Sequence, residues 1–194
     1  MIGFLVSAGV VALAEIGDKT QLLALLLAAK YRKPVPIILG ILVATLLNHS
    51  LAGLIGAWLA AAIGAEALRW VLGLSFIAMA GWMLVPDQAD DLDTIAPRFG
   101  VFVATTLAFF LVEMGDKTQI ATVALAARYA SLITVVAGTT VGMMLANVPA
   151  VLLGEVASRK LPMRLVHAIA AGVFLLLGLL VLFGAGQSLV IQHH

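Results

Sequence analysis

Long apolar runs alternate with short polar breaks along the whole chain. A transmembrane helix needs about 20 consecutive, mostly apolar residues, and six segments meet that requirement. The six predicted spans cover residues 2–29, 36–62, 68–85, 99–127, 132–156 and 164–190. The first and fourth spans are longer than a single crossing needs, so we expect each to be tilted, or broken near its Gly-Asp step. Proline residues fall between the spans or, as Pro36 does, at the first residue of one, except for Pro149, which lies inside the fifth span and is expected to kink it.

The second half of the chain repeats the first. A shift of 98 residues places Glu15–Gln21 (EIGDKTQ) on Glu113–Gln119 (EMGDKTQ), and it also places Gly40 on Gly138. The Gly-x-x-x-small series that begin at these two glycines predict close helix packing. Each repeat holds three predicted spans. Because three is an odd number, the second repeat has to cross the membrane in the opposite sense, which is the plan of many secondary transporters.

We therefore predict an all-α integral membrane protein with six transmembrane helices, arranged as two inverted three-helix repeats. The predicted divisions are a first repeat at residues 1–85, an acidic linker at 86–98, a second repeat at 99–192 and an expression-tag remnant at 193–194.

Composition agrees with a membrane protein. Hydrophobic residues make up 63% of the chain and charged residues 11%, whereas a soluble domain carries roughly 25% charged residues. Too few polar side chains are therefore present to cover a water-facing surface, and the lipid bilayer is the expected partner. A net charge of +1 leaves no basic face for a nucleic acid. The absence of cysteine excludes disulfides, thiolate catalysis and thiolate metal sites.

Positive charges near the ends of the spans predict the orientation. Lysine and arginine are concentrated in cytoplasmic loops. The loops after the first, third and fifth spans hold Lys30, Arg32, Lys33, Arg98, Arg159, Lys160 and Arg164. The opposite side holds only Arg69 and Arg128. We therefore expect the acidic linker to be cytoplasmic and both termini to lie outside.

Each repeat also places two carboxylates and a lysine inside an apolar span. These six residues are Glu15, Asp18 and Lys19 in the first repeat, and Glu113, Asp116 and Lys117 in the second. An ionised side chain at the centre of a lipid-facing span costs roughly 2.5–3.5 kcal/mol, so these groups are expected to face one another, water or a bound ion. Inverted repeats would let the two motifs meet at mid-membrane. Four negative and two positive charges leave a balance of −2, which matches one divalent cation.

The polar groups of the motif are oxygen donors of the kind that suits Ca²⁺, Mn²⁺ or Mg²⁺. The predicted metal ligands are Glu15, Asp18, Gln21, Glu113, Asp116 and Gln119. The predicted supporting residues are Lys19, Lys117, Thr20, Thr118, Asn48, His49, Asn147, Gly17 and Gly115. The lysines are expected to balance charge, because an ammonium group cannot coordinate a cation. The two glycines would let the backbone approach the ion or let the helix open.

Two questions about these residues have alternative answers. Asn48, His49 and Asn147 either complete the site or relay protons, or they only form hydrogen bonds between helices. The acidic motifs either bind an ion or form structural salt bridges, Glu15 with Lys19 and the equivalent pair in the second repeat. The salt-bridge alternative explains neither the aspartates nor the repetition of the whole motif.

Clustered carboxylates cannot all stay ionised without a cation. Cation entry should therefore favour proton release, which is the basis of an antiporter.

The motif Glu-x-Gly-Asp-Lys-Thr, present twice as EIGDKT and EMGDKT, resembles that of the Gdt-type cation transporter family of the LysE superfamily. The resemblance covers essentially the whole chain. It implies six spans and divalent cation:proton exchange by alternating access, centred on Glu15, Asp18, Glu113 and Asp116. It also implies that the chain is not an enzyme and needs no cofactor.

The short loops are similar to those of the bacterial members, which include manganese exporters. This likeness implies export of Mn²⁺ from the cytoplasm across a bacterial inner membrane, with a Ca²⁺:proton antiporter as the alternative. An intramembrane aspartyl protease is a remote alternative, because Asp18 and Asp116 each follow a glycine. A protease dyad, however, needs neither the flanking glutamate and lysine nor a repeat.

Overall fold

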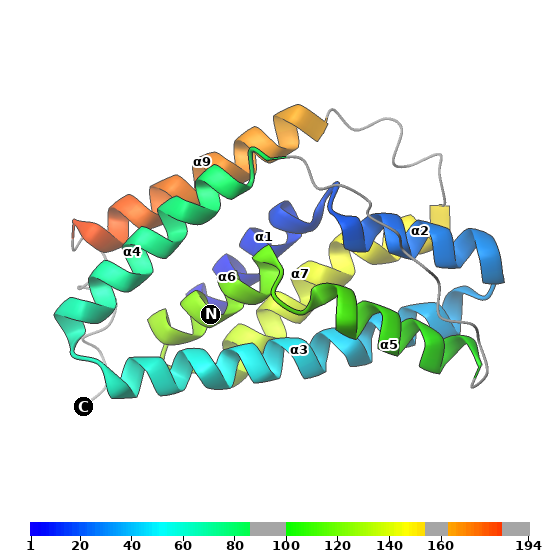
Figure 1. The fold of residues 1–194 in the computed structure, drawn as a ribbon, viewed down its shortest axis with the longest axis horizontal. Coiled ribbons are helices and arrows are strands. Elements are labelled where there is room, and N and C mark those ends of the chain that lie inside the picture. Colours follow the sequence, from blue (N-terminus) through cyan, green and yellow to red (C-terminus); the bar gives the residue numbers. More distant parts are fainter. Residues whose placement is uncertain (86–99, 154–162, 184–194) are drawn as a thin grey trace.

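The computed structural model describes residues 1–85, 100–153 and 163–183, and this part of the chain consists of helices with no strand (Figure 1). The helices are α1 (Ile2–Glu15), α2 (Lys19–Tyr31), α3 (Pro34–Ala62), α4 (Ala65–Trp82), α5 (Val101–Glu113), α6 (Lys117–Arg128), α7 (Leu132–Leu153) and α9 (Met163–Leu182). The prediction of an all-α chain is confirmed for these ranges. The acidic linker, the tag remnant and the ends of the fifth and sixth predicted spans lie outside the described residues.

The first and fourth predicted spans are each broken into two helices, as the Gly-Asp steps indicated. α1 ends at Glu15 and α2 begins at Lys19, and the second repeat has the same break between α5 and α6. Gly17 and Gly115 adopt φ angles of 83° and 77°, a region that side-chain-bearing residues rarely occupy. Because the helix stops between Glu15 and Lys19, their one-turn spacing does not place these two residues on one continuous helix face.

The packing of the helices follows the sequence repeat. The 98-residue shift relates α1 to α5, α2 to α6, α3 to α7 and α4 to α9. Accordingly, α1 packs along α7 and α5 along α3, while α6 packs on α3 and α2 on α7. α4 and α9 pack along each other at one side of the molecule (Figure 1).

The α4–α9 pair departs from this symmetry. α4 also packs on α6, and α9 also packs on α1. Within the described ranges, neither helix of the pair packs extensively on α2 or α5. The α4–α9 pair therefore packs on one helix of each broken span, α1 of the first and α6 of the fourth.

Glycines allow the closest helix approaches. A Cβ atom at Gly138 would lie 2.6 Å from the carbonyl oxygen of Phe4 in α1, and one at Gly40 would lie 2.8 Å from Cβ of Thr105 in α5. Both distances are too short for an added methyl group, so the prediction of close packing at these two equivalent glycines is confirmed.

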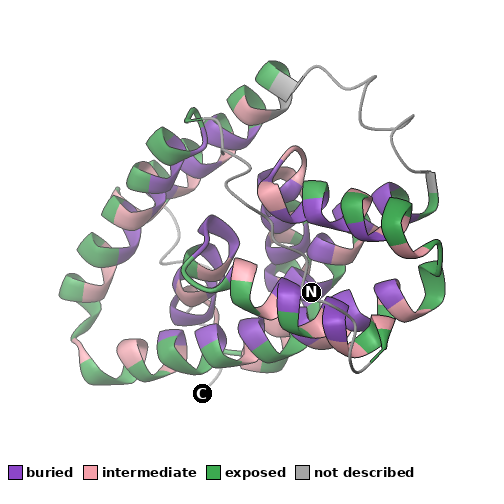
Figure 2. Cartoon of the chain, turned by 45° about the vertical axis from the view of Figure 1, so that its right-hand side comes forward, coloured by how far each residue is buried: buried purple, intermediate pink, exposed green. Residues whose placement is uncertain are grey.

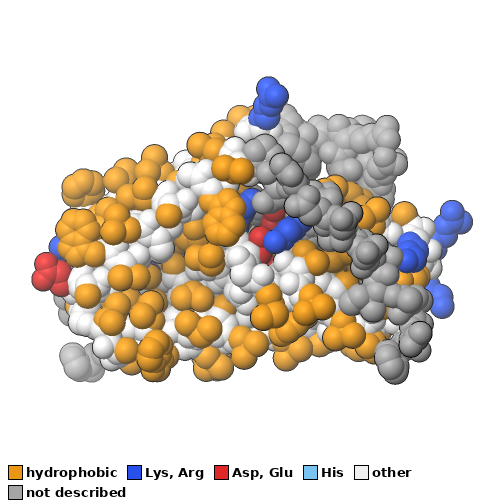
Figure 3. Space-filling model, viewed as in Figure 1, with side chains coloured by type: hydrophobic (Ala, Val, Ile, Leu, Met, Phe, Trp, Pro, Cys, Tyr) orange, Lys and Arg blue, Asp and Glu red, His pale blue; other side chains and the backbone are white. Residues whose placement is uncertain are grey.

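The outer faces of the helices carry apolar side chains. Figure 2 shows buried residues on the faces that meet other helices and exposed residues on the outward faces. The surface in Figure 3 is mainly hydrophobic. Two helical segments of the described chain, Pro34–Ala62 and Leu132–Leu152, are individually long and apolar enough to cross a membrane. The helices Ile2–Glu15 and Val101–Glu113 are apolar but shorter, as is the segment His167–Leu182. Six spans and an inverted arrangement therefore stay predictions.

Candidate functional site

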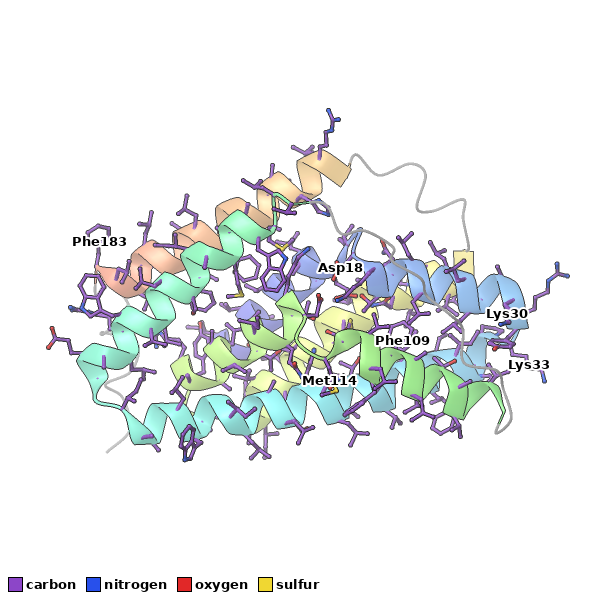
Figure 4. All side chains as sticks on the ribbon, in the orientation of Figure 1. Asp18, Lys30, Lys33, Phe109, Met114 and Phe183 are labelled. Carbon is purple, nitrogen blue, oxygen red and sulfur yellow. The ribbon has the colours of Figure 1, made fainter. Side chains whose placement is uncertain are left out.

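The carboxylates of the two motifs are buried next to the two helix breaks. Glu15, Asp18, Glu113 and Asp116 are each at most 2% exposed. Figure 4 shows Asp18 at the α1–α2 break and Met114 at the α5–α6 break, both about midway along the molecule. The side chain of Glu15 interacts electrostatically with the other three carboxyl groups. The structure therefore brings the two motifs together in the interior.

Ion pairs cross between the motifs. Nζ of Lys19 lies 2.9 Å from Oδ1 of Asp116, and Nζ of Lys117 lies 3.8 Å from Oδ1 of Asp18. Each lysine therefore neutralises an aspartate of the other repeat. The two side chains differ in exposure, since that of Lys19 is 29% exposed and that of Lys117 only 3%.

The two glutamates have equivalent but chemically different neighbours. Nδ2 of Asn147 donates a hydrogen bond of 3.3 Å to Oε1 of Glu15. At the equivalent place in the other half, Nε2 of His49 lies 3.8 Å from Oε1 of Glu113, which also accepts a hydrogen bond from the hydroxyl of Thr118. One glutamate is thus next to an amide and the other next to an imidazole, because the 98-residue shift places Asn147 on His49.

The surroundings of Thr20 differ from those of Thr118 in the other repeat. Thr20 is the counterpart of Thr118, and its hydroxyl is buried without a hydrogen-bond partner in the described structure. A buried hydroxyl in this condition costs free energy unless another group satisfies it.

The two glutamines brace the turns at the helix breaks. Oε1 of Gln21 accepts a 2.9 Å hydrogen bond from the N–H of Gly17, and Oε1 of Gln119 accepts one of 2.7 Å from the N–H of Gly115. Their amide nitrogens reach α7 and α3 respectively. The predicted ligand oxygens of both glutamines are thus hydrogen-bonded to the backbone. The four-residue spacing between glycine and glutamine was the available signal for this role, which was not predicted.

The polar residues of the long helices also lie at the site. Asn48 donates a 3.0 Å hydrogen bond from Nδ2 to the carbonyl oxygen of Phe110, where α5 approaches its break. Nδ2 of Asn147 lies 3.1 Å from the carbonyl oxygen and also 3.1 Å from Sδ of Met143. The position of this buried thioether was not predicted, because an apolar residue in an apolar span gives no sequence signal.

The carboxylates are engaged by protein groups in this arrangement. In the part of the chain that the structure describes, no three aspartate, glutamate or histidine side chains converge closely enough to hold a metal ion. Several buried carboxylate oxygens nevertheless have no hydrogen-bond partner there, namely Oε2 of Glu15, Oε2 of Glu113 and Oδ2 of Asp116. Such oxygens favour a cation as neighbour, because an unsatisfied buried carboxylate is costly. A shared metal ion would require these side chains to move toward one another.

Comparison with known proteins agrees with this chemistry. The family model of the divalent cation/proton antiporter GDT1 matches residues 3–91 and 101–188, which include both motifs. A protein of Vibrio cholerae serotype O1 named "Putative manganese exporter" is 53% identical over 179 residues, which cover 92% of this chain and 89% of the relative. No solved structure gives a significant match. The chain therefore belongs to the GDT1 divalent cation/proton antiporter family, a family of transporters and not of enzymes.

Proposed function

We propose that the chain exports Mn²⁺ from the cytoplasm in exchange for protons, with Ca²⁺:proton exchange as the alternative main role. Membership of the family supports divalent cation:proton antiport, and the name of the Vibrio cholerae relative supports manganese. The metal ion and the protons are both substrates, so the exchange needs no cofactor.

The observation that carries this proposal is the burial of four carboxylates at two neighbouring helix breaks. Two ammonium groups lie among them, so the cluster has a balance of two negative charges when all four carboxylates are ionised. Either one divalent cation or two protons would neutralise that balance. Because a buried net charge is costly, the cluster should bind one or the other, and this competition couples the two fluxes.

We assign the ligands of the transported ion to Glu15, Asp18, Glu113 and Asp116. Carboxylate oxygens suit both Mn²⁺ and Ca²⁺. Oε1 of Gln21 and Oε1 of Gln119 each accept one hydrogen bond from a backbone N–H. Because an amide oxygen has a second lone pair, we keep both glutamines as proposed ligands.

We place the chain in the bacterial inner membrane, with six spans and with both termini outside. Lys30 and Lys33 lie at one end of the molecule (Figure 4), and the positive-inside rule favours the cytoplasm for that end. The exposed Trp58 and Trp70 belong to the opposite end, close to the α3–α4 turn. Tryptophan is favoured at membrane–water interfaces, which supports an outer interface there. Transport would then proceed by alternating access to the buried carboxylates.

The test uses purified protein in proteoliposomes with an imposed pH gradient and either Mn²⁺ or Ca²⁺ as the cation. We expect the gradient to drive uphill Mn²⁺ movement, and we expect Glu15→Gln and Asp116→Asn to abolish it. Glu66→Gln is the matched control, because Glu66 is exposed at the start of α4. Transport of Ca²⁺ in preference to Mn²⁺ would support the alternative role. The antiport mechanism is wrong if the gradient moves neither ion, and the site assignment is wrong if both motif variants transport normally.

A further inference from the structure

The two motif lysines are equivalent in sequence but unequal in surroundings. Lys19 makes the shorter ion pair, 2.9 Å to Asp116, and its side chain is partly exposed. Lys117 makes the longer one, 3.8 Å to Asp18, and its side chain is buried. A charged lysine with appreciable exposure in the middle of an apolar protein requires water beside it. Of the two motif lysines, Lys19 is therefore the one at the accessible edge of the cluster.

The helix breaks show the same inequality. Met114 is 57% exposed and Gly115 is exposed as well. Their counterparts in the first repeat, Ile16 and Gly17, are only partly exposed. Figure 3 shows a few charged side chains in the middle of an otherwise apolar face. The α5–α6 break, which contains Asp116, is thus the more open of the two.

Helix packing gives a physical reason for this inequality. The α4–α9 pair packs on α1 and α6 and makes no extensive contact with α2 or α5 in the described chain. α6 begins with Lys117, whereas α2 begins with Lys19. The lysine of the helix on which the pair packs is the buried one. The 98-residue repeat relates α2 to α6 and α5 to α1. If the pair packed on α2 and α5 instead, Lys19 would therefore have the surroundings that Lys117 has here, and Lys117 those of Lys19.

A divalent cation that reaches Asp116 from the open side meets the ammonium group of Lys19 first. The ammonium group and the metal ion repel each other, and both seek the same carboxylate oxygen. We propose that Lys19 is a tethered competitor, whose ammonium group holds Asp116 until the entering divalent cation displaces it. Lys117 is paired with Asp18 in the equivalent way in the other half of the cluster. Both lysines keep their charge throughout, and the inference rests on the proposed function.

This competition would weaken cation binding and speed cation release. An acidic cluster without it would hold a divalent ion too tightly to let it leave, and transport needs binding that is favourable but reversible. The lysines would therefore lower the affinity for the cation and raise the turnover rate. A purely structural salt bridge would not have these opposite effects.

The first experiment measures Mn²⁺ binding by the purified full chain and transport in proteoliposomes. Close charge pairs are coupled strongly enough that we expect Lys19→Gln to bind Mn²⁺ at least about tenfold more tightly and to turn over more slowly. Lys19→Arg keeps the competing charge and should bind Mn²⁺ much as the wild type does. Lys33→Gln is the matched control, because Lys33 is exposed and precedes α3 far from the motif. Equal or weaker binding by Lys19→Gln would overturn the inference.

The second experiment needs no variant and remains decisive if Lys19→Gln does not fold. An amine-reactive reagent is applied to the wild type with and without Mn²⁺, and the labelling rate of Lys19 is read by mass spectrometry. We expect Mn²⁺ to raise that rate several-fold by releasing Lys19 from Asp116. A rate that stays constant or falls, in protein that binds Mn²⁺, overturns the inference and leaves the proposed function standing. Wild-type protein that neither binds nor transports Mn²⁺ or Ca²⁺ overturns both.

Discussion

Replacing Gly142 with alanine tests the close packing of α1 against α7. A Cβ atom at this position would lie 2.5 Å from the carbonyl oxygen of Ala8 and 3.0 Å from the amide nitrogen of Ala12. Both atoms belong to the backbone of α1 and cannot rotate away. Ordinary contact begins at 3.4 Å, so α7 has to move by about 0.9 Å to relieve the closer contact.

Two opposing terms decide the size of the effect. Overpacking of this kind costs about 1–3 kcal/mol, whereas alanine in place of glycine stabilises a helix by about 1 kcal/mol. Gly9, on α1, has no atom within 4 Å of an added Cβ, so Gly9→Ala obtains the helical gain without the clash. We therefore expect Gly142→Ala to be about 1–3 kcal/mol less stable than Gly9→Ala, because the helical gain cancels between them.

The same movement should reach the functional site. α7 carries Asn147 and α1 carries Glu15, and these residues share a hydrogen bond of 3.3 Å. A displacement of about 0.9 Å would take this bond beyond hydrogen-bonding distance. Gly142→Ala should therefore also transport Mn²⁺ more slowly than Gly9→Ala.

The assay is denaturant unfolding of both variants in the same detergent, followed by transport measurements in proteoliposomes. The difference in the free energy of unfolding between the two variants is the quantity to compare. Equal stability of Gly142→Ala and Gly9→Ala would refute the argument, since the α1–α7 contact would then tolerate a methyl group without cost.

Three further predictions concern the helix breaks and the topology. Gly17→Ala and Gly115→Ala should each lower the free energy of unfolding by about 1–2 kcal/mol, because alanine disfavours positive φ; denaturant unfolding with no loss in either variant would contradict the turn geometry. Gln21→Leu should cost about 1–3 kcal/mol by leaving the partly buried N–H of Gly17 without its acceptor, and wild-type thermal stability would show that the brace is unimportant. The chain has no cysteine, so Lys33→Cys and Ala65→Cys can each be labelled alone with an impermeant thiol reagent in right-side-out vesicles. We expect labelling of Ala65→Cys at once and of Lys33→Cys only after permeabilisation, and labelling of both at once would argue against α3 as a span.

Much of the local structure was predictable from the sequence. Gly17 and Gly115 stand inside long apolar runs, next to aspartates, and both runs break there. Glycine at such a place lets the backbone take a conformation that ends a helix. The near-identical backbone angles of the following residues, φ −82° and ψ 168° at Asp18 and φ −81° and ψ 168° at Asp116, show that the repeated motif has a repeated local conformation.

The ion-pair partners were not predictable. The one-turn spacing of Glu15 and Lys19 offered this pair only as the alternative to ion binding, and the helix ends between the two residues. The structure instead pairs Lys19 with Asp116, at the other helix break. The hydrogen bond from the N–H of Gly17 to Oε1 of Gln21 was not predicted either.

The sequence by itself determined the helical class, the apolar surface, the two breaks and the residues that carry the charge. These properties depend on single residues and their near neighbours, through backbone preferences and the cost of placing charge in an apolar run. Tertiary structure decided which lysine faces which aspartate, and that Lys19 is accessible while Lys117 is buried. Contacts and exposure of this kind depend on how helices far apart in the chain pack together. In the described chain the α4–α9 pair packs on α6 and makes no extensive contact with α2, so two nearly identical motifs acquire different surroundings.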